Sequence, residues 1–220
     1  MTALANIRRA AVMAAATLTL AACSGGKSGP AVGTGADMTQ GSPTAPVKVM
    51  EYASPTCPHC ARFNADVFPA FKKKYIDTGK VEYIFREMPV HPALDGPVFL
   101  LARCAGKDKY FTVIDAVMRA QPEYFRSDSM TQVGADLRPV LMRVAQSVGL
   151  NEQQAIACMS DADQVKKMND RVEAEAKQYS VEATPTFVVD GKKVEPSAGG
   201  EPDLAFLDSV IQPELAKKKS

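Results

Sequence analysis

The chain has 220 residues, of which 46% are hydrophobic, and a formal net charge of +1. This length and composition fit one or two small globular domains with a proper hydrophobic core. A charge so close to neutral gives no support for nucleic-acid binding, and the lysines at residues 217–219 are too few for an interaction arm.

Residues 1–22 predict a signal peptide that is not part of the fold. The positive pair Arg8 and Arg9 precedes an apolar run from Ala10 to Ala22, which is too short for a bilayer span of about 20 residues. The run ends in Leu-Ala-Ala-Cys at Cys23, which resembles a bacterial lipobox. That resemblance implies cleavage before Cys23, lipidation of its sulfur and new amino group, and a membrane anchor. The alternative is an ordinary signal peptide with a chance cysteine.

Residues 23–46 predict a flexible linker behind this lipidated cysteine. The segment is rich in Gly, Ser, Thr, Pro and Ala and has no apolar periodicity. We expect it to hold a folded domain just off a membrane. It is too short and too poor in apolar residues for a dimerisation domain, so we expect a monomer.

A short motif joins the first predicted strand to the first predicted helix. The apolar run from Val47 to Tyr52 predicts a buried strand, and the stretch from Ser54 to Cys60 (SPTCPHC) follows it. Apolar residues then recur every four positions, at Phe63, Val67, Phe71 and Tyr75. This arrangement places Cys57 at the helix N-cap and Cys60 one turn later on the same face. Pro58 suits the first helical position, where its missing N–H costs nothing.

The position of Cys57 at a helix start predicts a redox-active cysteine pair. The partial positive charge and the free N–H groups of the helix N-terminus both favour a thiolate, and His59 can add a charge or a hydrogen bond. Each unit by which the pKa of Cys57 falls stabilises the thiolate by about 1.4 kcal/mol and makes the disulfide more oxidising by about 30 mV. A structural disulfide or half of a metal site are the alternatives.

Glu51 is a candidate buried acid close to this pair. It shares a strand face with Val47 and Val49. A buried carboxyl group without a partner is costly and tends to stay protonated. The sequence reveals no lysine that can be assigned as its partner. The alternative is a carboxylate in water at the end of the strand.

Helical patterns dominate the middle of the chain. Pro69 is expected to kink or break the first helix, and residues 81–89 predict a second strand. His91 is interpreted as structural or exposed. Further helices are predicted at residues 93–105, 110–120, 137–148, 152–159 and 162–179.

The five cysteines are expected to form one lipid site and two pairs. Lipidation of Cys23 leaves four cysteines, which allow three connectivities. Spacing pairs Cys57 with Cys60 and leaves Cys104 with Cys158, both within the helical region. A bond between Cys104 and Cys158 would stabilise the fold by about 4 kcal/mol at most. Two separate buried thiols are the alternative.

The strand pattern resumes near the C-terminus. Residues 181–194 contain Thr184-Pro185 at a strand entry and Asp190-Gly191 as a hairpin turn. An amphipathic helix is predicted over residues 201–216.

The stretch from Glu51 to Cys60 and the pair Thr184-Pro185 together resemble the DsbA family of thioredoxin-like bacterial thiol–disulfide oxidoreductases. The resemblance implies an α/β fold: a thioredoxin-like sheet flanked by helices and interrupted by an inserted all-helical domain. The implied boundaries are residues 47–91 and 180–217 for the thioredoxin-like domain and residues 92–179 for the insertion. Glu51 would relay protons to or from Cys60.

The resemblance also implies a cis peptide at Thr184–Pro185, packed against Cys57, where the Thr184 backbone can pair with a substrate strand. An ordinary trans proline is the alternative. The implied protein is a periplasmic oxidase, anchored to the inner or outer membrane through Cys23. It would pass its disulfide to unfolded or reduced secreted proteins, regain it from a quinone-linked membrane partner of the DsbB kind, and need no dissociable cofactor.

Two other functions compete with the oxidase. A disulfide isomerase or reductase has the same fold: Pro58-His59 and the lack of a dimerisation domain favour the oxidase, whereas Thr184 before the proline resembles isomerases and reductases. A metal-binding lipoprotein could use Cys57, His59 and Cys60 for a soft ion such as Cu(I), but the sequence offers no further convergent ligand.

Overall fold

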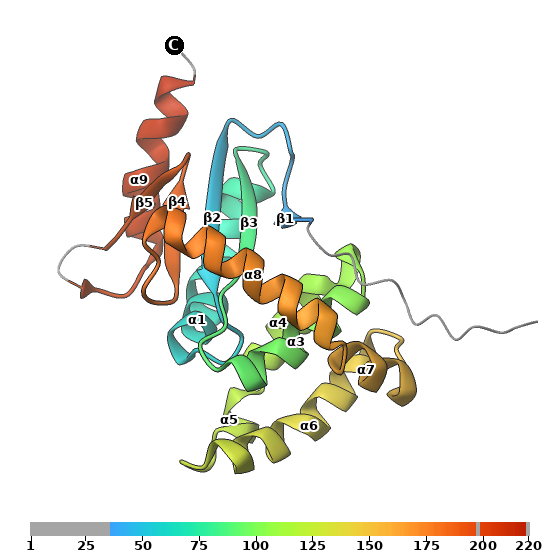
Figure 1. The fold of residues 1–220 in the computed structure, drawn as a ribbon. Helices are drawn as coiled ribbons and strands as arrows, with labels where there is room; N and C mark the ends of the chain where they lie inside the picture. Colours follow the sequence, from blue (N-terminus) through green and yellow to red (C-terminus); the bar gives the residue numbers. More distant parts are fainter. Residues whose placement is uncertain (1–35, 197–198, 219–220) are drawn as a thin grey trace, which may run out of the picture.

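A five-stranded mixed sheet forms the centre of the computed structural model, which describes residues 36–196 and 199–218 (Figure 1). The strand order is β1-β3-β2-β4-β5. β2 and β3 run parallel, and the other neighbours run antiparallel. The strands are β1 (Met38–Gln40), β2 (Val47–Ala53), β3 (Val81–Glu87), β4 (Thr186–Val189) and β5 (Lys192–Val194).

Helices cover both faces of the sheet and form a cluster at its side (Figure 1). Residues 58–76 form one helical stretch, in which α1 (Pro58–Arg62) and α2 (Phe68–Phe71) alternate with the π-helical turns η1 (Phe63–Val67) and η2 (Lys72–Ile76). The remaining helices are α3 (Pro92–Cys104), α4 (Lys107–Arg119), α5 (Gln121–Tyr124), α6 (Met130–Ser147), α7 (Glu152–Met159), α8 (Ala162–Tyr179) and α9 (Leu204–Lys217). Within the described part of the chain, no helix is both long and apolar enough to cross a membrane.

Pro69 changes the first helix locally instead of ending it. It lies in the first turn of α2, directly after the π-helical turn η1. A proline removes one hydrogen bond of the helix, and a π-helical turn absorbs such a disturbance within a continuous helix. The helix is therefore not broken at Pro69 but changes its hydrogen-bond pattern just before it.

The two faces of the sheet pack against different helices. Tyr52 of β2 lies against Tyr179 of α8, with ring centroids 6.3 Å apart, and α8 crosses one face of the sheet in Figure 1. Val49 of β2 points to the opposite face from Tyr52, where it is part of the main hydrophobic core together with Leu207 of α9. Since side chains alternate along a strand, Glu51 points to the same side as Val49.

The helical region shares a core with the sheet. Phe85 of β3 contacts Phe99 of α3 and Tyr110 of α4, with ring centroids 6.4 and 5.9 Å apart. The predicted helices are present, and the sequence missed the short α5, the first turn of α4 and the first turns of α6. The start of α6 is fixed by Ser129, whose hydroxyl accepts a hydrogen bond from the Gln132 N–H.

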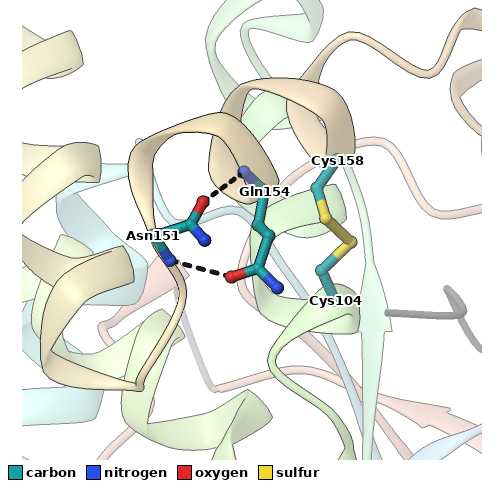
Figure 2. The surroundings of a disulfide bond; sticks show 4 residues. All are labelled: Cys104, Asn151, Gln154 and Cys158. Atoms are coloured by element: carbon teal, nitrogen blue, oxygen red, sulfur yellow. Dashed lines mark hydrogen bonds between the residues drawn. A yellow bond between two sulfur atoms is a disulfide. The ribbon is translucent and has the colours of Figure 1, made fainter. Parts of the chain in front are cut away.

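The predicted disulfide joins two helices of the insertion (Figure 2). Cys104 at the end of α3 is bonded to Cys158 in α7, at a sequence separation of 54. A capping box holds the start of α7: the Asn151 side chain accepts from the Gln154 N–H at 2.9 Å, and the Gln154 side chain accepts from the Asn151 N–H at 3.0 Å. The pairing of Cys104 with Cys158 is thus confirmed.

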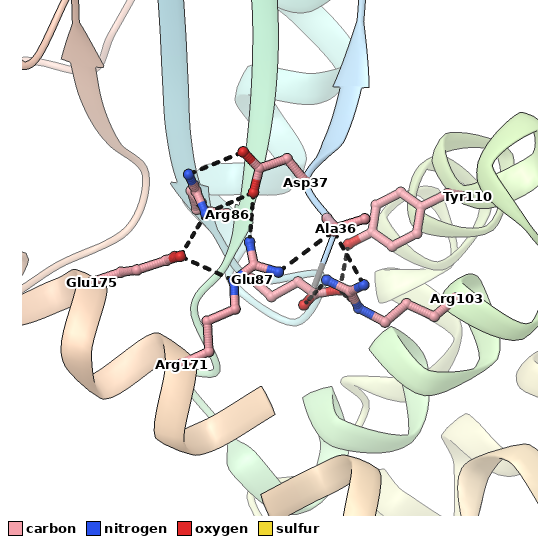
Figure 3. A network of polar contacts seen from close by, with 8 residues as sticks. All are labelled: Ala36, Asp37, Arg86, Glu87, Arg103, Tyr110, Arg171 and Glu175. Carbon is pink, nitrogen blue, oxygen red and sulfur yellow. Dashed lines mark hydrogen bonds and ion pairs between the residues drawn. The ribbon is translucent and has the colours of Figure 1, made fainter. Parts of the chain in front are cut away.

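The prediction of a flexible linker is wrong for its last residues. Met38–Gln40 forms the edge strand β1, and Met38 is buried. Asp37 forms ion pairs with Arg86 of β3 at 2.8 Å and Arg171 of α8 at 2.9 Å (Figure 3). Composition did not reveal this segment because its partners are far away in the sequence. The predicted signal peptide at 1–22 and lipidation at Cys23 lie outside the described residues.

Candidate active site

Cys57 lies where β2 passes into α1, as the sequence predicted. It is the N-cap of α1, with φ −81° and ψ 124°, and Pro58 follows at the first helical position. The Cys57 N–H donates to the Ser54 carbonyl at 3.2 Å, which closes a tight turn between strand and helix. The sulfur therefore faces the unpaired N–H groups of the helix start.

Several donors converge on the Cys57 sulfur and lower the pKa of this thiol to about 5. The hydrogen bond from the Cys60 thiol has the largest effect, and burial opposes it. The Thr184 hydroxyl, together with the backbone N–H groups of Cys60 and His59, lowers the pKa further. The Thr184 hydroxyl is buried and makes no hydrogen bond of ordinary geometry within the described residues, so it is free to act on the sulfur. At neutral pH Cys57 is a thiolate.

Cys60 behaves in the opposite way. Its side chain has no exposed surface, and burial raises the pKa of its thiol well above the usual value. Its hydrogen bond to Cys57 and the charge of Glu51 raise that pKa further. Both cysteines are free thiols in this structure. The pair thus combines a reactive thiolate with a protonated thiol one turn deeper.

Glu51 is buried, as one of the two interpretations expected, and is 2% exposed. The Tyr83 hydroxyl donates to its Oε2 at 2.5 Å. Burial raises the pKa of Glu51 to about 8, and the Tyr83 hydrogen bond opposes that rise. The sequence search looked for a lysine and missed Tyr83. Only the register of β2 and β3, which pairs Val49 with Tyr83, brings this tyrosine diagonally opposite Glu51.

The Thr184–Pro185 peptide bond is cis, as the family resemblance implied. It lies immediately before β4, and the Thr184 carbonyl oxygen lies 3.4 Å from the Cys57 sulfur. β4 pairs with β2, which leads into the cysteine motif. The sheet therefore brings two motifs 127 residues apart into contact.

The His59 imidazole does not interact with the Cys57 sulfur as the sequence predicted, but with Glu201. Its Nδ1 lies 2.5 Å from the Glu201 carboxylate and 2.9 Å from the Arg62 guanidinium, on the exposed side of α1. The backbone N–H of His59 is among the groups that lower the pKa of Cys57. Glu201, which lies before α9, was not identified from the sequence because it is distant along the chain.

A buried aspartate of the insertion holds the loop before Cys57. Asp95 in the first turn of α3 accepts hydrogen bonds from the Ser54 hydroxyl at 2.9 Å and the Thr56 N–H at 3.2 Å. His91 donates its own N–H to Asp95 at 2.8 Å, and its Nδ1 lies 2.9 Å from the Thr56 hydroxyl. Burial raises the pKa of Asp95. His91, interpreted from sequence as structural or exposed, is thus part of the support of the site.

Gln121 of α5 holds the same loop from another side. Its amide donates to the carbonyl oxygens of Pro55 at 2.9 Å and Cys57 at 3.1 Å. The Tyr124 hydroxyl also reaches the Pro55 carbonyl, at 3.3 Å. These contacts could not be predicted from the sequence, since α5 itself was not predicted.

The described residues contain no group of three or more His, Cys, Asp or Glu side chains that could hold a metal ion. Cys57, His59 and Cys60 do not converge on one point, because the His59 imidazole faces Glu201. The geometry favours thiol chemistry at Cys57.

A family model described as thioredoxin matches residues 33–208, which is most of the chain. The chain belongs to the thioredoxin family. Within this family its likeness is to DsbA proteins. It resembles crystalline alpha-DsbA1 of Wolbachia pipientis with a TM-score of 0.71 and 29% sequence identity, over 83% of this chain and 92% of that one.

Two proteins related to the chain in sequence are named for disulfide chemistry. One is a Rickettsia conorii protein named among the protein-disulfide oxidoreductases, 33% identical over 83% of this chain and 62% of its own length. The other is disulfide bond formation protein D of Bacillus subtilis, 27% identical over 81% of this chain and 77% of its own length. The chain spans about three fifths of the length of the rickettsial relatives it matches. The fold and the family predicted from the sequence are confirmed.

Proposed function

We propose that this thioredoxin-family protein is a DsbA-like thiol–disulfide oxidoreductase, which transfers the Cys57–Cys60 disulfide to cysteine pairs of secreted proteins. The observation that carries the proposal is the opposite behaviour of the two thiols. The pKa of Cys57 is lowered to about 5, and that of Cys60 is raised. A stabilised Cys57 thiolate favours the reduced pair. Because the pKa of Cys57 lies about two units below pH 7, the reduction potential of the pair rises by about 60 mV at that pH. The disulfide is then a strong oxidant.

The transfer proceeds by two thiol–disulfide exchanges. A substrate thiolate attacks the Cys57 sulfur of the disulfide, the Cys57–Cys60 bond breaks, and Cys60 leaves with the electron pair and takes up a proton. A mixed disulfide between Cys57 and the substrate forms beside Pro185. A second substrate thiolate attacks the substrate sulfur, and Cys57 leaves as a thiolate. The substrate is oxidised by two electrons, and the enzyme is reduced by two.

The proposed compartment and redox partner follow from the need to reoxidise the Cys57–Cys60 pair after each transfer. Disulfide formation requires an oxidising compartment, for which we propose the periplasm. A quinone-linked membrane protein of the DsbB kind would restore the Cys57–Cys60 disulfide, and the protein would act as a monomer without a dissociable cofactor. Lipid on Cys23 would hold it at the inner or outer membrane, close to that partner.

Disulfide isomerase or reductase activity is the second candidate, because Thr184 before the cis proline resembles those enzymes. Here, however, the Thr184 hydroxyl lowers the pKa of Cys57. In this site it therefore acts in the same direction as an oxidising dipeptide, which favours the oxidase.

The deciding experiment is the redox equilibrium of Cys57–Cys60 with glutathione, combined with oxidation of a reduced secreted protein. We expect a potential well above that of thioredoxin, which is about −270 mV, and net disulfide formation in the substrate. Cys57→Ser should abolish exchange, whereas Cys60→Ser should trap mixed disulfides. A potential close to that of thioredoxin would favour the reductase, and equal partial losses in both variants would contradict the proposed roles.

A further inference from the structure

His91 is one of only two histidines in the chain, and its imidazole is fixed against the loop before Cys57. Its Nδ1 lies 2.9 Å from the hydroxyl oxygen of Thr56, the residue that precedes Cys57. On another side the ring contacts Phe125, which follows α5, with ring centroids 6.0 Å apart. The imidazole thus reaches the loop through the Thr56 hydroxyl.

The hydroxyl groups of Ser54 and Thr56 connect this imidazole to a buried carboxyl group. The Ser54 hydroxyl oxygen lies 3.2 Å from that of Thr56, and 2.9 and 3.0 Å from the two carboxyl oxygens of Asp95. All three residues are 0% exposed. A group in this chain that loses its partner therefore finds no replacement in solvent, and the cost of leaving it unsatisfied is high.

The number of available hydrogens fixes the direction of this chain. Asp95 also meets the backbone N–H groups of Thr56 at 3.2 Å and His91 at 2.8 Å, which can only donate. Burial raises the pKa of Asp95, but these donors and the Ser54 hydroxyl oppose the rise and favour the carboxylate. Because a carboxylate only accepts, the single hydrogen of the Ser54 hydroxyl points to Asp95.

The Thr56 hydroxyl then has one arrangement that uses both of its contacts. Since the Ser54 hydrogen is already engaged, Thr56 donates to the Ser54 oxygen and accepts from Nδ1–H of His91. In the reverse arrangement Thr56 donates to Nδ1, and the 3.2 Å contact between the two hydroxyl oxygens holds no hydrogen. The first arrangement has one hydrogen bond more, in a buried site where neighbouring bonds strengthen one another.

The chain holds the turn that leads into α1. Ser54 and Thr56 belong to this turn, which the Cys57 N–H closes on the Ser54 carbonyl at 3.2 Å. Beside the Cys60 thiol, which lowers the pKa of Cys57 most, the backbone N–H groups of Cys60 and His59 lower it further. These N–H groups follow directly after the turn, so a shift of the turn moves the Cys57 sulfur relative to them.

We propose that Thr56 and His91 are positioning residues for Cys57. The His91 imidazole, the Thr56 hydroxyl and the Ser54 hydroxyl form one directed chain of hydrogen bonds that ends on a buried carboxylate. This chain keeps the turn in the geometry in which the helix start stabilises the Cys57 thiolate. His91 is the N-cap residue of α3, so the chain ties the reactivity of Cys57 to the helical insertion. The proposal rests on the thiol exchange proposed above and is independent of its direction.

The first test follows the Cys57 thiolate by its absorbance during a pH titration of the reduced protein. Thr56→Val removes the hydroxyl, keeps the branched shape and breaks the chain in its middle. We expect the acid dissociation constant of Cys57 to fall about threefold or more. The glutathione equilibrium of Cys57–Cys60 should shift by the same factor towards the disulfide. Thr56→Ser keeps the hydroxyl and should titrate like the unaltered protein.

Two replacements of His91 test the direction of the chain. Asparagine carries its amide nitrogen as many bonds from Cα as histidine carries Nδ1, so His91→Asn keeps a donor in that place. Glutamine carries its amide nitrogen one bond further, like Nε2, so His91→Gln removes the donor. We expect His91→Asn to titrate like the unaltered protein and His91→Gln like Thr56→Val. Equal titrations of the two His91 variants would overturn the role of Nδ1.

Thr78→Val is the control for the loss of a threonine hydroxyl, because Thr78 donates to the Lys74 carbonyl at 2.7 Å in an exposed turn before β3. Its Cys57 titration should be unchanged. Urea unfolding is measured on the same variants, and a loss of stability in Thr56→Val with an unchanged titration would overturn the proposal. If Thr56→Val does not fold, the two variants of the partly exposed His91 decide. The glutathione potential of the unaltered protein reports on the oxidase function, so the two proposals can fail independently.

Discussion

Two cysteines three positions apart differ in chemistry because one caps a helix and the other lies inside it. Cys57 meets the N–H groups of the helix start, and Cys60 is enclosed by the core. The contrast is sharpened by the buried Thr184 side chain, which lowers the pKa of Cys57. At this scale, single hydrogen-bond donors set the redox properties.

Replacing Thr184 by valine should raise the pKa of Cys57. A hydrogen bond to a charged group contributes about 1.5–3 kcal/mol, so we expect a rise of about one unit and a disulfide less oxidising by about 30 mV. Thiolate absorbance during a pH titration measures the change. Thr186→Val is the control, because the Thr186 hydroxyl donates to the Ala183 carbonyl and not to Cys57. An unchanged titration in Thr184→Val would show that this hydroxyl does not lower the pKa of Cys57.

The lowered pKa of Cys57 also predicts how stability depends on pH. Because the pKa is lower in the folded than in the unfolded chain, the thiolate stabilises the reduced protein fully above the unfolded pKa near 9, and this contribution is lost as pH falls through about 5. At pH 7 it amounts to about 2–3 kcal/mol. Chemical unfolding at pH 7 and pH 4 should show the loss in the reduced protein. The oxidised protein and reduced Cys57→Ser, which lack this titration, should not show it.

At the scale of elements, the active-site loop is held by the helical insertion from two sides. Asp95 of α3 accepts from the Ser54 hydroxyl and the Thr56 N–H, and Gln121 of α5 donates to the Pro55 and Cys57 carbonyls. Buried backbone groups need such partners because their loss leaves a desolvated group without compensation. The insertion therefore supports the geometry of the cysteine pair.

Gln121→Ala should lower the free energy of unfolding by about 1–3 kcal/mol, because two carbonyl oxygens lose a buried donor. It should also shift the Cys57–Cys60 potential, since the Cys57 backbone is no longer fixed from this side. Urea unfolding and glutathione equilibration measure the two effects. Gln132→Ala is the control, since the exposed Gln132 side chain donates to Asp136 one turn later in α6 and lies away from the loop. A potential identical to that of the unaltered protein would limit Gln121 to a structural role.

At the scale of the whole molecule, one core and one polar network join the sheet to the insertion. Glu87 of β3 is buried with Arg103 of α3, which it binds at 2.7 Å, and with the Tyr110 hydroxyl at 2.9 Å. Beside them, Arg86 and Arg171 hold Asp37 at the entry to β1 (Figure 3). Breaking one member of a buried ion pair is strongly destabilising, so this network fixes the two parts of the molecule relative to one another.

Replacing Cys104 and Cys158 together by alanine should cost stability and spare activity. The bond closes a loop across a separation of 54 residues, and its removal should lower the free energy of unfolding by about 2–4 kcal/mol. Chemical unfolding measures this loss, and the exchange rate of Cys57–Cys60 should stay within about twofold, because Cys104 lies at the opposite end of α3 from Asp95, which holds the active-site loop. A selective loss of exchange with unchanged stability would contradict a purely stabilising role.

Much of the site could be predicted because its first contacts are local. The strand, the turn and the helix around Cys57 follow from apolar periodicity, from Pro58 and from cysteine spacing. Strand alternation made a buried Glu51 one of two interpretations, and the structure decided for it. Tyr83, Asp95, Gln121 and Glu201 could not be found, because each reaches the site through a register, a helix packing or a loop that no local pattern encodes.

The sequence by itself predicted the reactive pair and the run of helices between strands, because helix starts and periodicity act over a few residues; it left the bond between Cys104 and Cys158 as one of two alternatives, which the structure decided. Only the tertiary structure decided that residues 38–40 form a strand, that the His59 imidazole faces Glu201, and that a tyrosine supports Glu51. These contacts join residues that are distant along the chain. Their free energy comes from packing and desolvation in the assembled core, which exist only after the chain has folded.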